Sequence, residues 1–161
     1  MGRSLTPSDI SELWTQLTME GNALFEAGEF KPALDVYERA RGVALTNVTG
    51  WSDWDDALAA IVVSHLNLSE AQARLGFVSQ AAHTLCTMHG SLSRTAGDDT
   101  QQAQLRDAAG RYLGETRSAM LRFQVHYGVQ PHIEHLLALG CGCVHCAGKN
   151  HGWRSGRVTL H

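Results

Sequence analysis

The sequence has few of the features that mark nucleic-acid-binding, membrane-spanning or secreted proteins. Only Lys31 and Lys149 are lysines among its thirteen basic residues, the formal net charge is −3 and no basic stripe occurs, so we expect no nucleic-acid partner. The longest apolar stretch, ALAAIVVSHLNL, is too short and too polar to span a bilayer. The first nine residues, MGRSLTPSD, contain no hydrophobic signal region. We therefore expect a cytoplasmic protein without a membrane span.

Cysteine is also scarce. The chain of 161 residues has four cysteines, and three of them, Cys141, Cys143 and Cys146, lie in the segment LGCGCVHCAGKNHGW. Because the cytoplasm keeps thiols reduced, we expect no disulfide framework. A chain of this length is typical of one domain and buries a core without covalent links.

Strand patterns are missing as well, since no stretch alternates polar and apolar residues. Apolar residues recur instead at helical spacing, and in the first predicted helix they are Ile10, Leu13, Trp14, Leu17, Leu24 and Phe25. Thr6 and Ser8 are candidate N-caps of this helix, and Gly28 is a candidate stop. We predict an all-α fold in which residues 10–46 and 53–93 form two antiparallel helix hairpins stacked side by side. A polar break over 93–99, a long helix over 100–127 and a short helix over 132–140 follow.

The segment GNALFEAGEFKPALDVYERA, residues 21–40, resembles the tetratricopeptide repeat (TPR). Small residues of that repeat let two helices approach closely, and large residues fill the adjoining gaps. The matching positions are Gly21, Leu24, Gly28, Phe30, Ala33, Tyr37 and Ala40. The sequence differs from the repeat at two positions: Leu17 stands where the repeat has a tryptophan, and Glu20 where it has a leucine.

A weaker second copy reads HLNLSEAQARLGFVSQAAHTLCTM. Its Ser69 corresponds to Gly21, 48 positions earlier, whereas such repeats usually recur after about 34 residues. Gln72 stands where a large apolar residue is expected. The long step and the HLNL segment resemble the TPR domains of immunophilin-type co-chaperones. The helical stretch that follows is either a third repeat or a capping helix.

The resemblance implies a concave groove that binds a segment of another protein. Its groove positions correspond to Thr18, Asn22, Phe25, Asn67, Glu70 and Arg74. Asn22 and Asn67 match two asparagines of the chaperone-type clamp for a C-terminal carboxylate, but Thr18 replaces the clamp's lysine. Arg106 and Arg111 are the nearest candidates for its basic pair.

The three clustered cysteines suggest a metal site in a tail over residues 141–161, outside the helical domain of residues 1–140. Thiolate and imidazole are ligands that zinc prefers, and a tetrahedral site needs four of them. Cys141, Cys143 and Cys146 supply three, and either His151 or His135 supplies the fourth. Two alternatives stay open: a redox C-x-x-C pair, and a tail whose thiols have no function.

No spacing indicates catalysis, because the chain has no Ser-His-Asp order, phosphate-binding glycine loop or dinucleotide fingerprint. We therefore expect a protein-interaction module rather than an enzyme: a TPR adaptor or chaperone-like protein whose tail binds zinc for structure. The alternative is a metal- or redox-handling protein whose functional site is the cysteine-rich tail. We interpret Trp51, Trp54, His65 and Cys86 as packing residues.

We predict that natively purified protein carries one zinc ion per chain and that Cys143→Ser loses it, because three thiolates and one imidazole complete the tetrahedral site. Elemental analysis of both proteins checks this. Affinity should fall as the pH falls, because protons compete for the thiolates. A parent protein without stoichiometric metal, or a variant that retains it, would contradict the site.

Overall fold

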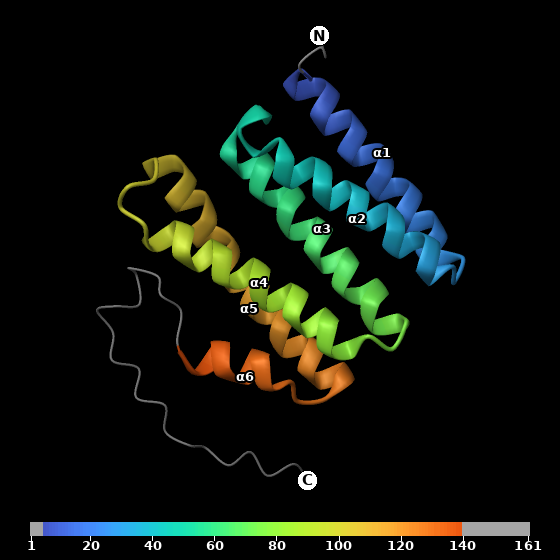
Figure 1. Ribbon diagram of the computed structural model, residues 1–161. Helices are drawn as coiled ribbons and strands as arrows, with labels where there is room; N and C mark the ends of the chain where they lie inside the picture. The colour runs from blue at the N-terminus through green and yellow to red at the C-terminus, as the bar shows by residue number, and fades with distance from the viewer. Residues whose placement is uncertain (1–4, 140–161) are drawn as a thin grey trace.

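The structure, a computed structural model, describes residues 5–139. These residues form six α-helices that pack as adjacent antiparallel pairs, with no strand among them (Figure 1). The helices are α1 (Pro7–Glu26), α2 (Phe30–Thr46), α3 (Trp54–Arg74), α4 (Val78–Gly97), α5 (Ala103–Tyr127) and α6 (Pro131–Ala138), and a short 3-10 helix, η1 (Val48–Gly50), joins α2 to α3. The predicted all-α fold with stacked helix hairpins is confirmed.

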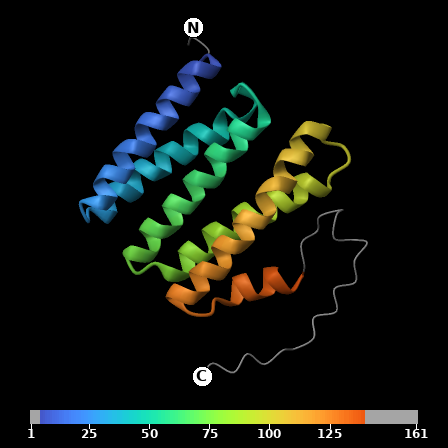
Figure 2. The ribbon, with the colours of Figure 1, turned by 180° about the vertical axis from the view of Figure 1, so that it is seen from behind.

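Helix α3 lies at the centre of the stack, in contact with α1, α2, α4 and α5. From behind, α5 lies in front of α4 (Figure 2). The short α6 packs against α4, and its Ile133 is fully buried in the largest core cluster. Within residues 5–139, no helix has the length and hydrophobicity needed to cross a membrane.

Helix boundaries follow local capping chemistry. At the start of α1, the Thr6 hydroxyl accepts a hydrogen bond from the Asp9 amide at 3.2 Å, and the Asp9 carboxylate accepts one from the Thr6 amide at 2.9 Å. This reciprocal pair is a capping box. At the start of α3, the Asp53 carboxylate accepts from the Asp56 amide at 2.8 Å. Of the two candidate N-caps of α1, Thr6 is therefore the one used, and Asp53 caps α3.

Both hairpins turn at a glycine in the left-handed region, Gly28 with φ +79° and Gly76 with φ +86°. In the first turn, the Gly28 amide donates to the Phe25 carbonyl at 3.0 Å and the Glu29 amide to the Leu24 carbonyl at 2.9 Å. The second turn repeats this bonding 48 positions later, at 3.0 and 2.9 Å. This pair of bonds is the Schellman motif, which satisfies the last carbonyls of a helix. The two hairpins therefore repeat in backbone geometry as well as in sequence.

The first hairpin packs closely at a small residue. Ala33 is fully buried beside Leu24 and Tyr37, as predicted. A Cβ atom placed on Gly21 would lie 2.5 Å from Cε1 of Tyr37, so the tyrosine ring occupies the space that any side chain at residue 21 would need. The Tyr37 hydroxyl donates to Oδ1 of Asn22 at 2.8 Å.

The second hairpin reaches the same packing through polar contacts. The Ser69 hydroxyl donates to the Ala81 carbonyl at 3.1 Å. Gln72, which fits the apolar pattern poorly, is 2% exposed, and its Oε1 accepts from the Thr84 hydroxyl at 2.8 Å. A buried amide of this kind is tolerated when it has a partner. Thr84 therefore explains how a glutamine occupies a core position.

One predicted boundary is wrong. The sequence predicts a polar break over 93–99, but α4 continues to Gly97 and only residues 98–102 separate it from α5. Ala96 and Leu105 pack against the main core cluster, and this tertiary contact extends the helix through residues that are polar and weak helix formers.

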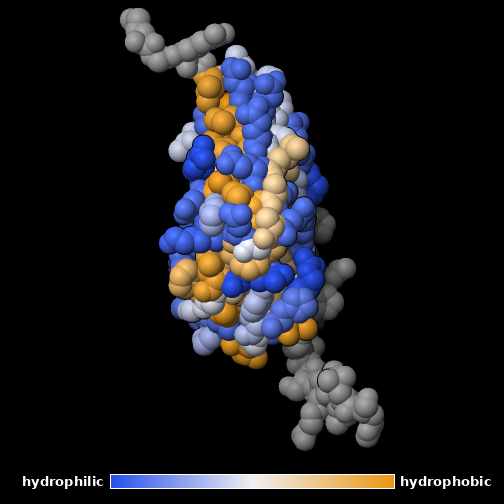
Figure 3. Space-filling model, turned by 90° about the vertical axis from the view of Figure 1, so that its right-hand side faces the viewer, coloured by the Kyte–Doolittle hydropathy of each residue, from blue (hydrophilic) through white to orange (hydrophobic). Residues whose placement is uncertain are grey.

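Large apolar side chains remain exposed on the first and last long helices. On α1, Leu13 and Met19 are exposed, and on α5 so are Leu121 and Val125. Figure 3 views the molecule from the side of α1 and shows a narrow hydrophobic band between hydrophilic residues. Terminal helices of a stack lack a neighbour on one side, which accounts for this exposure.

We predict that Gly21→Ala destabilises the fold by about 1–3 kcal/mol, because the new methyl group overlaps the Tyr37 ring. Gly42→Ala is the matched control: no atom lies within 4 Å of a Cβ at that helical position, so alanine should stabilise by about 0.5–1 kcal/mol. Urea denaturation measures both changes. Equal effects of the two substitutions would contradict the close approach at Gly21.

Candidate binding groove

Four of the six predicted groove residues line one pocket of about 150 Å³: Asn22 and Phe25 of α1, and Asn67 and Glu70 of α3. Glu26 and Tyr37 complete its lining. Helical spacing explains the set, since side chains three or four residues apart share one face of a helix. We call this the first pocket.

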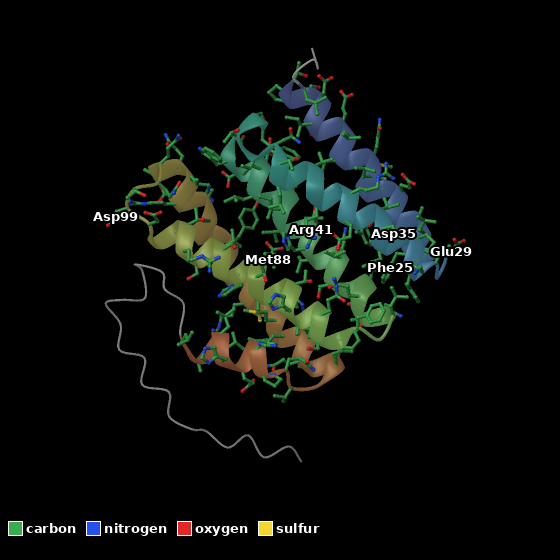
Figure 4. The ribbon with its side chains drawn as sticks, in the orientation of Figure 1. Phe25, Glu29, Asp35, Arg41, Met88 and Asp99 are labelled. Atoms are coloured by element: carbon green, nitrogen blue, oxygen red, sulfur yellow. The ribbon has the colours of Figure 1, made fainter. Side chains whose placement is uncertain are left out.

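Arg74 does not line the first pocket, but it contacts two residues that do, Phe25 and Glu70. Its guanidinium carbon lies 5.5 Å from the ring centroids of both Phe25 and Phe30, a cation–π arrangement. Its Nε donates to Oε1 of Glu70 at 3.1 Å. Figure 4 shows Phe25 near the turn that joins α1 and α2. The charge of Arg74 is thus already paired.

Thr18 is set apart from the pocket. Its hydroxyl oxygen is buried and has no hydrogen-bond partner within residues 5–139. The candidate basic pair is elsewhere too: Arg106 pairs with Asp99 at 2.9 Å, and Arg111 with Asp55 at 2.6 Å. Asp55 is in the first turn of α3, about 18 Å along the helix from the level of Asn67. The cations that a carboxylate clamp needs are therefore not at the first pocket.

A second pocket of about 350 Å³ adjoins the first, and Glu70 lines both. Its other lining residues come from α3, α4 and α5 and are Leu66, Ser69, Leu85, Ala119, Arg122, Phe123, His126 and Tyr127. The Tyr127 hydroxyl donates to Oε1 of Glu70 at 3.0 Å. We call the two pockets together the groove.

The residues of α5 that line the second pocket were not predicted from the sequence. They recur at i, i+3, i+4, i+7 and i+8 from Ala119, which is one helix face. That periodicity identifies a face, but it does not show which face meets α3.

The two pockets differ in charge. Glu26 and Glu70 line the first pocket, while Arg122 lines the second beside Glu70. Burial raises the pKa of Tyr37, and nearby Glu26 raises it further. Its hydroxyl therefore stays protonated and able to donate. The groove offers hydrogen bonds, an apolar floor and charges of both signs.

The predicted zinc ligands cannot be placed. Cys141, Cys143, Cys146 and His151 lie outside the described residues, and His135 is exposed on α6. No three His, Cys, Asp or Glu side chains between residues 5 and 139 are grouped so as to hold a metal ion.

The predicted packing residues lie in or beside the core. Trp54 and Cys86 are half-buried against the main core cluster, and the Trp51 ring packs edge-on against Trp14 at 6.0 Å between centroids. Nδ1 of the buried His65 lies 2.7 Å from the carbonyl oxygen of Ile61, and this contact identifies Nδ1–H as a donor.

Comparison with known proteins identifies one family. A family model described as "Protein of unknown function (DUF2753)" matches residues 12–151. No curated protein and no solved structure matches the chain. The assignment to the TPR family is wrong, because this model, rather than a TPR model, matches the chain. Close packing of two antiparallel helices requires small and large residues at set spacings in any family, which accounts for the misleading pattern.

We predict that two buried histidines reduce stability at acidic pH. Burial lowers the pKa of His65 and of His89, and Arg117 lowers that of His89 further. Near and below the unfolded-state pKa of about 6.5, the unfolded chain therefore binds more protons than the folded chain, so the free energy of unfolding falls as the pH falls. Urea denaturation across a pH series measures this slope.

His89→Asn should flatten the slope and still donate to the Thr116 hydroxyl, which lies 2.7 Å from Nδ1 of His89. His83→Asn, at an exposed position of the same helix, should leave the slope unchanged. Identical slopes for both variants would show that His89 does not contribute.

Proposed function

We propose that this chain, which belongs to the family described as "Protein of unknown function (DUF2753)", is a protein-interaction module that binds an extended segment of a partner along its groove. The observation that carries the proposal is the continuity of the groove. Glu70 lines both pockets, so one binding surface runs from α1 across α3 to α5. Such a surface suits an extended segment with several side chains.

Contacts within the protein hold the groove in shape before any partner binds. Glu70 accepts hydrogen bonds from both Arg74 and Tyr127, and Asn22 accepts one from Tyr37. Because these side chains are already ordered, binding loses less conformational entropy than it would with free rotamers.

The charges of the groove favour particular partner side chains. A lysine or arginine fits the first pocket, where Glu26 provides a carboxylate and Asn67 an amide beside the Glu70–Arg74 pair. An apolar or acidic side chain fits the second pocket, where Phe123 lies beside Arg122. A free C-terminal carboxylate in the first pocket would meet the carboxylate of Glu26 and find Arg74 already paired with Glu70, so we do not propose a carboxylate clamp.

Zinc binding by the tail is a second proposal, and it concerns structure rather than recognition. The matched family range continues to residue 151, so it contains Cys141, Cys143, Cys146 and His151. The part of the tail up to residue 151 therefore lies in the same matched family range as the helices. Zinc held by thiolates suits a cytoplasmic protein, where cysteines stay reduced.

Selection of random linear peptides on the full chain tests the interaction proposal. We expect enriched peptides to contain lysine or arginine and to bind equally well with a free or an amidated C-terminus. Glu26→Lys should weaken them about tenfold, because it replaces a charge-assisted hydrogen bond with repulsion.

Glu20→Lys is the matched control, since it makes the same charge change on an exposed position of α1 outside both pockets. Its binding should equal that of the parent. Failure to select any peptide, or equal weakening by the two variants, would contradict the groove as the binding surface.

A further inference from the structure

A separate cleft of about 340 Å³ lies among α2, η1, α3, α4 and the start of α5. None of its lining residues lines the groove. Much of its lining is aliphatic, including Leu45, Leu58, Ile61 and Leu92. Its volume is at the lower end of the range of about 300–1,000 Å³ that is usual for small-molecule sites.

Among the described residues, His65 is the one ionisable side chain that lines this cleft. The side chain lines the cleft although the residue is only 5% exposed. Because Nδ1–H donates to the Ile61 carbonyl, Nε2 carries the lone pair, and no side chain or backbone group within residues 5–139 bonds to it. Burial lowers the pKa of His65 and Arg41 lowers it further, whereas the Ile61 contact and Glu38 raise it, so the ring stays neutral at neutral pH.

We propose that this cleft binds a small, neutral, mainly apolar molecule with one hydroxyl or N–H group, which donates a hydrogen bond to Nε2 of His65. Apart from His65, no side chain that lines the cleft is ionisable, which disfavours a charged ligand. Phenols, indoles and short alcohols have the required chemistry.

Polar side chains line one side of the cleft, and its volume indicates the size of ligand that it suits. Thr87, Ser91 and Thr95 line it from one face of α4, since they recur at every fourth residue. The Ser91 hydroxyl accepts a hydrogen bond from Arg94 at 3.1 Å, so this side of the cleft offers a polar edge. The volume, at the lower end for small-molecule sites, suits a single substituted ring rather than a folded peptide segment.

Titration of the full chain with 4-ethylphenol and with its methyl ether, 4-ethylanisole, tests the proposal. Methyl NMR signals of Leu45, Leu58, Ile61 and Met88 should shift and saturate, because these residues line the cleft. The phenol should bind about two- to tenfold more tightly than the ether, which cannot donate. His65→Leu should remove that difference and leave the affinity for the ether unchanged.

Ser91→Phe fills the rim and should abolish the shifts. Ser79→Phe makes the same change on an exposed part of α4 outside the cleft and should preserve them. The proposal is overturned if the parent shows no saturable shift, if phenol and ether bind equally, or if the shifts survive Ser91→Phe. Shifts confined to residues of the groove would also overturn it and would place the ligand there.

Discussion

The close approach of two helices at a small residue is the constraint on which the rest of the structure depends. At Gly21 the absence of a Cβ lets the Tyr37 ring lie against α1, and this position brings the tyrosine hydroxyl to Asn22. The second hairpin keeps the same spacing with Ser69 bonded to the Ala81 carbonyl. Because both hairpins have this geometry, their first helices lie alongside each other, and the lining residues of α1 and α3 face a common pocket.

Local sequence signals predicted most of the helices and their turns. They did not predict how helices far apart in the sequence pack against each other. The capping residue Thr6, the turn glycines Gly28 and Gly76 and the buried Ala33 each follow from chemistry within one hairpin. The residues of α1 and α3 that line the first pocket came from the resemblance to the tetratricopeptide repeat rather than from local signals. The contribution of α5 was missed, because the contact between Tyr127 and Glu70 depends on how α5 is rotated about its axis where it packs against α3. That rotation is set by tertiary packing, as is the extension of α4 past residue 93.

The match to DUF2753 shows that a packing pattern can predict a fold without identifying the family. Small and large residues at set positions specified an antiparallel pair of helices correctly, but they did not specify ancestry, since the matching family is DUF2753. Likewise, two asparagines at the expected positions did not determine what the pocket attracts. Glu26 and Glu70 stand beside them and decide the sign of the local charge. The proposed function therefore rests on the charged neighbours of the pattern more than on the pattern itself.

The position of Glu70 links the two halves of the groove thermodynamically. One of its carboxylate oxygens accepts hydrogen bonds from Arg74, which also contacts the aromatic rings of the first hairpin, and from Tyr127 of α5. If the groove binds a partner as proposed, a ligand that displaced either donor would change the bond that remains, so occupancy of one pocket would alter the affinity of the other. Such coupling is reciprocal by necessity. A partner that engages both pockets would then bind cooperatively, with a free energy that differs from the sum of its two separate contacts.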